Sequence, residues 1–169
     1  APCDDYYEPV CGCNDETYIN ACYAYAAGVL SYTNGPCGNT SPWCAEAVSI
    51  SCGDYLPYET TIGAGNQITY YPGATSAAMI GPDRVYVFQK TSAGDLQIGL
   101  EIMTPCLDMD LFLLTGPCDD YHVIGSSTTS NTVTNNEGIL LEDAPVGTYY
   151  IVVDQQAAGQ GGNYRLELS

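Results

Sequence analysis

The N-terminal fold is decided by the stretch Pro-Val-Cys-Gly-Cys-Asn-Asp-Glu-Thr-Tyr-Ile-Asn-Ala-Cys at residues 9–22, which Gly-Pro-Cys closes at residues 35–37. With Cys3, these cysteines bracket a segment that is too short to bury a self-sufficient apolar core. We therefore expect disulfides to hold residues 1–37 together. Residues 20–27 are rich in alanine and stop at Gly28, which predicts a helix, and residues 29–32 predict a short strand.

Three motifs in this segment, Pro-Val-Cys-Gly, Thr-Tyr-x-Asn-x-Cys and Gly-Pro-Cys, resemble a Kazal-type domain, the disulfide scaffold of many serine-protease inhibitors. The resemblance implies the disulfides Cys3–Cys22 and Cys11–Cys37, each contributing on the order of 3 kcal/mol. A six-cysteine Kazal domain has a third pair, whose two positions this chain leaves without cysteine; Tyr25 stands at one of them.

The same resemblance implies a protease-binding loop after Cys3, with Asp5 as the primary specificity residue. The candidate residues of this inhibitory loop are Asp4, Asp5, Tyr6 and Tyr7, with Asn20 hydrogen-bonding the loop from behind. An acidic protease pocket would repel Asp5, and an apolar pocket would strip its hydration without giving it a partner. Only a protease with a basic pocket would accept this loop, and a stapled module that inhibits nothing is the alternative.

From Ala45 onward the pattern changes to period two, with apolar and polar residues alternating along residues 48–52 and 96–102. Further predicted strands are residues 60–63, 67–71, 84–89, 110–114, 121–124, 131–134, 138–142, 148–154 and 163–168. Many short strands separated by turns predict an antiparallel β-sandwich of jelly-roll type over residues 45–169, with residues 38–44 as a linker. The fold class is therefore mainly β: a small disulfide-rich α+β unit, residues 1–37, followed by a sandwich. Trp43 is expected to be an anchor at the junction.

Four stretches of the second unit, residues 81–88, 109–114, 144–154 and 162–166, resemble the bacterial pre-peptidase C-terminal domain. That resemblance implies a β-sandwich module of secreted proteins, associated with binding, secretion or adhesion rather than with catalysis.

Composition limits the partners. With 20 Asp+Glu and 3 Lys+Arg, the formal charge of −17 excludes nucleic acid and anionic membrane surfaces, while cations, basic proteins and neutral polysaccharides remain. No apolar run is long enough to insert into a membrane. Nine cysteines predict an oxidising compartment, and hence a secreted, extracellular or cell-surface protein. Ala1-Pro2-Cys3 looks like the start of a mature chain after removal of a targeting segment.

The remaining cysteines give two further predictions, Cys44–Cys52 and Cys106–Cys118. These pairs leave Cys13 as the odd cysteine, either a free thiol or an intermolecular bridge. Calcium is the one cofactor that the sequence suggests, and the carboxylates that could converge on it are Asp108, Asp110, Asp119 and Asp120.

The sequence holds no catalytic constellation. Its single histidine, His122, falls in a predicted strand, and no nucleophile elbow, phosphate loop or metalloprotease helix occurs. The 15 tyrosines exceed what cores need and suit contact surfaces. We therefore predict a non-enzymatic secreted protein that self-assembles into a fibre or matrix, or adheres to a protein partner. The alternatives are a Kazal-type inhibitor of an extracellular protease, and a calcium- or carbohydrate-binding accessory module.

Overall fold

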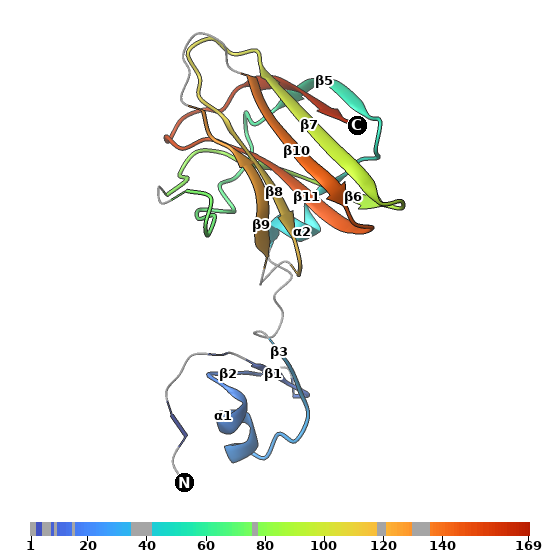
Figure 1. Ribbon diagram of the computed structural model, residues 1–169. Helices are drawn as coiled ribbons and strands as arrows, with labels where there is room; N and C mark the ends of the chain where they lie inside the picture. Colours follow the sequence, from blue (N-terminus) through green and yellow to red (C-terminus); the bar gives the residue numbers. More distant parts are fainter. Residues whose placement is uncertain are drawn as a thin grey trace. The chain divides into compact units, whose positions relative to one another are not determined.

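The structure is a computed structural model, which describes residues 3–4, 8, 10–14, 16–34, 42–75, 78–117, 121–129 and 136–169 (Figure 1). The chain divides into two compact units, with the boundary between Pro42 and Trp43. The predicted boundary between linker and sandwich, residue 45, falls within α2 (Pro42–Ala45).

The small unit is one helix on a short antiparallel sheet. Strands β1 (Val10–Gly12), β2 (Thr17–Tyr18) and β3 (Tyr32–Asn34) form the order β2-β1-β3, and α1 spans Ala21–Ala26. Its core is small and consists of Val10, Ala24 and Val29.

Helix α1 ends in a Schellman motif. Gly28 has φ +83, its N–H donates to the Tyr25 carbonyl at 2.9 Å, and the Val29 N–H donates to the Ala24 carbonyl at 2.9 Å. The predicted helix is therefore confirmed, but the next strand starts at Tyr32 instead of residue 29, because Val29 is bonded to the helix end and buried in the core.

The large unit is a β-sandwich of two sheets, drawn as two layers of strands in Figure 1. One sheet has the order β10-β7-β12-β5 and the other β4-β6-β11-β8-β9. All pairings are antiparallel except that of β4 with β6. The strands are β4 (Val48–Ser49), β5 (Tyr55–Thr60), β6 (Arg84–Lys90), β7 (Gly94–Ile102), β8 (Asp110–Thr115), β9 (His122–Ser127), β10 (Asn136–Ala144), β11 (Gly147–Asp154) and β12 (Asn163–Leu168).

The core lies between the two sheets, where alternate residues of each strand meet. Leu96, Ile98 and Leu100 of β7 face Leu111 and Leu113 of β8 in a single buried cluster with the inward residues of β6, β11 and β12. Two hydroxyls share this core: Tyr86 and Tyr164 hydrogen-bond to each other at 2.6 Å, which satisfies both groups. The period-two pattern thus gives a mainly antiparallel sandwich, as predicted.

Two predicted strands are wrong. Residues 60–63 mostly follow β5 as a turn, since the strand occupies Tyr55–Thr60. Residues 67–71 are irregular because their backbone is held by side chains: the N–H groups of Gln67 and Ile68 donate to the buried carboxylate of Asp83, both at 2.7 Å. The predicted strand at residues 131–134 lies outside the described residues.

Trp43 is buried within the large unit. Its indole makes edge contacts with the rings of Tyr121 and Tyr150, with centroids 5.6 and 5.1 Å away. It therefore anchors α2 to the outer face of the five-stranded sheet.

Candidate functional site

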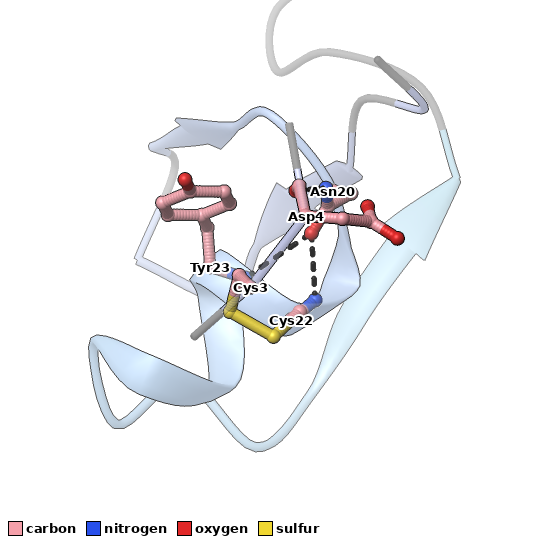
Figure 2. The surroundings of a disulfide bond; sticks show 5 residues. All are labelled: Cys3, Asp4, Asn20, Cys22 and Tyr23. Atoms are coloured by element: carbon pink, nitrogen blue, oxygen red, sulfur yellow. Dashed lines mark hydrogen bonds between the residues drawn. A yellow bond between two sulfur atoms is a disulfide. The ribbon is translucent and has the colours of Figure 1, made fainter. Parts of the chain in front are cut away.

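A disulfide ties the start of the chain to helix α1. Cys3 is bonded to Cys22, the second residue of the helix, with their Cα atoms 5.7 Å apart (Figure 2). The bridge predicted between these residues is therefore present. It fixes one end of the candidate loop, because Asp4 follows Cys3 directly.

Asn20 connects this loop end to the helix through a single side chain, as Figure 2 shows. Its Oδ1 caps α1 by accepting from the N–H groups of Cys22 at 3.0 Å and Tyr23 at 3.3 Å. Its Nδ2 donates to the main-chain oxygen of Asp4 at 2.9 Å. Since Asn20 is buried, both contacts are shielded from water. They hold the loop end at a fixed position relative to the start of the helix.

The described part of this arrangement presents acidic side chains to solvent. Asp4 and Glu8 are exposed, and the Glu8 N–H donates to the Ile19 carbonyl at 3.0 Å. Asp5, Tyr6 and Tyr7, the predicted tip of the loop, lie outside the described residues.

The disulfide framework differs from the prediction in the large unit. Cys11 and Cys44 are both disulfide-bonded, whereas Cys52 has a free thiol, so the predicted Cys44–Cys52 bridge is wrong. Residues 48–50 are extended and paired with β6. This extended segment separates Cys52 from Cys44 in α2. Cys37, the predicted partner of Cys11, lies outside the described residues.

The predicted Cys106–Cys118 bridge is also wrong, because Cys106 has a free thiol. Its backbone has φ +60 in an exposed turn before β8, and its side chain is exposed to solvent. Cys13 is free and exposed too, which agrees with its assignment as the odd cysteine. Among the described residues, three exposed thiols therefore remain unpaired within the chain.

The predicted calcium residues are only partly brought together. Asp108 is half-buried and Asp110 buried, while Asp119 and Asp120 lie outside the described residues. In the part of the chain that is described, no group of three or more His, Cys, Asp or Glu side chains is placed to hold a metal ion. Burial, followed by the charges of Asp108 and Glu137, raises the pKa of Asp110 to about 7. A calcium site in this region stays a prediction.

A second buried carboxylate, at the end of β11, went unnoticed in the sequence. Asp154 is fully buried, and accepts from the Tyr71 hydroxyl at 2.6 Å and from the Gln155 N–H at 2.7 Å. Burial raises the pKa of Asp154 to about 7 in spite of these hydrogen bonds, and the charges of Asp83 and Asp110 act in the same direction. The Tyr71 ring stacks on Phe112 with centroids 3.6 Å apart. An aspartate directly after the apolar run Ile-Val-Val was the signal that could have revealed it.

The surplus tyrosines separate into two groups. Tyr71, Tyr86, Tyr149 and Tyr164 are buried in the large unit, whereas Tyr55, Tyr58 and Tyr70 are 55%, 85% and 53% exposed. His122 is exposed at the start of β9. Across the described ranges no helix is long and apolar enough to cross a membrane.

Fold and site together define a small disulfide-linked unit followed by a β-sandwich. Comparison with solved structures finds the crystal structure of the pre-peptidase C-terminal domain of a collagenase from Bacillus anthracis, with a TM-score of 0.52, 18% identity, and coverage of 73% of this chain and 95% of that domain. The Yersinia pseudotuberculosis-derived mitogen matches with a TM-score of 0.35 and 19% identity, covering 53% of this chain and 86% of that one. No family model and no curated protein matches the sequence.

At this identity the collagenase domain shows the fold alone. It confirms the β-sandwich and supports the resemblance of the second unit to a pre-peptidase C-terminal domain. The resemblance of residues 1–37 to a Kazal-type domain stays a prediction.

The two roles of Asn20 can be separated by substitution. Asn20→Asp keeps an oxygen that caps α1 but loses the amide donor to Asp4, whereas Asn20→Ala loses both contacts. We expect Asn20→Ala to destabilise the helix by about 1 kcal/mol and to free the loop. Asn20→Asp should free the loop while the helix keeps its protection. Hydrogen exchange of the helix amides and limited proteolysis after Cys3 measure the two effects, and equal helix protection in the two variants would contradict the assignment.

Stability should depend on pH through Asp110 and Asp154. Their pKa values are raised from 3.8 to about 7 in the folded chain, so folding favours the protonated forms. Their stabilising contribution is complete below about pH 4 and is lost as the pH rises through 7. We expect the free energy of unfolding to fall by roughly 5 kcal/mol between pH 5 and pH 8, because each of the two groups contributes about 1.4 kcal/mol per pH unit up to its raised pKa.

Thermal or denaturant unfolding at several pH values measures this change. The window begins at pH 5 because this pH lies above the ordinary pKa values of Asp and Glu side chains in water. The variant Asp110→Asn/Asp154→Asn should show a clearly flatter profile than the natural chain, and an unchanged slope would exclude these two groups as its cause.

Proposed function

We propose that this protein is a non-catalytic extracellular subunit that acts through its surfaces, associating with further copies of itself in a fibre or matrix. The observation that carries the proposal is the number of large apolar side chains on the surface of a very acidic chain. Tyr58 is 85%, Leu30 78%, Leu140 61% and Val146 60% exposed. Removing side chains of this size from water in a contact lowers the free energy.

The edges of the four-stranded sheet support association. Strands β5 and β10 are the two outermost strands, and each carries one of these side chains, Tyr58 and Leu140. Edge strands offer backbone hydrogen-bonding groups to another chain. Tyrosine is also enriched in protein contacts because it supplies a large area at low entropic cost.

The exposed thiols support a covalent contribution. Cys13, Cys52 and Cys106 are free in a chain whose Cys3, Cys11, Cys22 and Cys44 are oxidised. Thiols of two copies can join by exchange with a small-molecule disulfide: each bridge formed between copies releases two thiol molecules and conserves electrons. The existing disulfides also support an extracellular location, where such exchange takes place.

Association is tested with the purified full chain by analytical ultracentrifugation and electron microscopy. We expect polymers at high concentration, and at least a tenfold weaker association in Tyr58→Ser/Leu140→Ser, because contact residues of this kind contribute 1.4 kcal/mol or more. Tyr70→Ser is the matched control, since Tyr70 is exposed but lies outside both edge strands.

The contribution of the thiols needs its own variant, because reductant would also open the Cys3–Cys22 bridge. Substituting serine at residues 13, 52 and 106 removes only the free thiols. The proposed assembly would be refuted if the natural chain stayed monomeric at high concentration, formed no polymer and sedimented like all of its variants.

Protease inhibition is the second candidate, favoured by the hydrogen bond from Asn20 to the Asp4 carbonyl. A loop held from behind resists the rearrangement that cleavage requires, and this is the role that the Kazal resemblance implies for Asn20. Titration against proteases that cleave after acidic residues should show tight inhibition, and Asp5→Leu should redirect it to proteases with apolar pockets. Failure of both titrations would remove this candidate.

A further inference from the structure

The outer face of the four-stranded sheet carries a hollow lined by residues from all four strands. Cross-strand pairing places Gly138, Gly99, Glu167 and Tyr55 in one row across β10, β7, β12 and β5. The neighbouring row consists of Asn136, Glu101 and Arg165. A space of about 260 Å³, which we call the Gly99 hollow, lies at these two rows. Except for Gly138, the residues of both rows line it, together with Leu100 and Glu137.

Gly99 lines the hollow without a side chain, and its cross-strand partner in β10, Gly138, adds none beside it. A Cβ atom at Gly99 would come no closer than 4.0 Å to Glu167 Cβ, and one at Gly138 no closer than 3.6 Å to the Ile98 carbonyl oxygen. Neither residue has a positive φ. Neither packing nor backbone conformation therefore requires glycine here, and strand interiors ordinarily disfavour it.

The walls combine one aromatic ring with charges of both signs. Arg165 Nη1 donates to Glu101 Oε2 at 2.8 Å, and both side chains remain accessible, at 35% and 51%. Tyr55 is 55% exposed at one end of its row, and Asn136 is exposed at the opposite edge strand. The hollow therefore offers donors, acceptors and an apolar ring face within one small space.

These walls discriminate between classes of ligand. The chain's charge of −17 repels anionic polymers. The carboxylates of Glu101, Glu137 and Glu167 outnumber the guanidinium of Arg165, which is paired with Glu101, so a cationic ligand is the competing class that the test has to separate. A purely apolar group would desolvate the Arg165–Glu101 pair without replacing its hydrogen bonds to water. The combination of donors, acceptors and an aromatic side chain fits a neutral ring whose hydroxyls both donate and accept and whose C–H face lies against Tyr55.

We propose that the Gly99 hollow binds one sugar ring of a neutral polysaccharide. At about 260 Å³ the space lies just below the range of about 300–1,000 Å³ for pockets that enclose small molecules, so it holds a single ring of a longer chain. Tyr58, further along β5, extends the surface for neighbouring rings. The inference does not depend on self-association, because one copy of the chain contains the whole hollow.

The test is affinity electrophoresis of the full chain in gels that contain a soluble neutral polysaccharide, with β-glucan, galactomannan and dextran tried separately, followed by calorimetry. We expect retardation by at least one of the three. Tyr55→Ala should weaken binding at least tenfold, and Gly99→Val should abolish it by filling the hollow. Tyr70→Ala, an exposed tyrosine outside the hollow, should bind like the natural chain.

Polylysine and an anionic polysaccharide serve as counter-probes. The proposal is overturned if none of the neutral polysaccharides retards the chain, if only polylysine binds, or if Tyr55→Ala binds as tightly as the natural chain. Thermal unfolding of each variant identifies loss of fold. Tyr55→Ala keeps the test decisive if Gly99→Val unfolds, because it truncates a side chain that is already exposed.

Discussion

Burial between the two sheets is the interaction on which the large unit depends. Strands β8 and β11 are covered on both faces: Leu111, Leu113 and Ile151 point into the core, while Phe112 and Val152 are equally buried on the opposite side. A strand that is buried on both faces can occur only in the middle of a sheet with a second layer over it. The long apolar runs of β8 and β11 therefore fix these strands at the centre of the five-stranded sheet.

On the outer face of this sheet, the covering layer consists of helix α2 and irregular chain. In this layer Tyr71 stacks on Phe112, and Trp43 contacts Tyr150. Two carboxylates accept hydrogen bonds from it: Asp83 from the Ile68 N–H and Asp154 from the Tyr71 hydroxyl. The outer face of the other sheet is open to solvent, because polar or charged residues and Gly99 alternate with buried apolar residues along β7 and β12. The two sheets therefore differ in role, one closed by its own chain and the other available for contact.

The sequence predicted what depends on periodicity and missed what depends on individual side chains. Alternation located most strands and the sandwich, and cysteine spacing with the Kazal resemblance led to Cys3–Cys22. Alternation failed at residues 67–71, where the Ile68 N–H is bonded to the side chain of Asp83 and not to a neighbouring strand. A periodic pattern of apolar residues cannot predict a side-chain contact 15 residues away. The two wrong disulfides failed for a related reason: Cys44 and Cys52 are close in sequence, but an extended strand separates them. The Gly99 hollow could not be predicted, since it depends on the registers of three strand pairings.

The distribution of basic residues connects this architecture with function. Of the three in the chain, Lys90 is buried, Arg84 is half-buried, and Arg165 lies on the open sheet face beside Glu101. Elsewhere an acidic surface offers mostly acceptors, which keeps copies apart unless apolar groups or covalent bridges join them. Recognition of a neutral ligand needs donors as well, and the guanidinium supplies several from one position. The chain has few basic residues, and it exposes one of them, Arg165, beside an aromatic ring and the Gly99 hollow. Its capacity for polar recognition is therefore concentrated on that face.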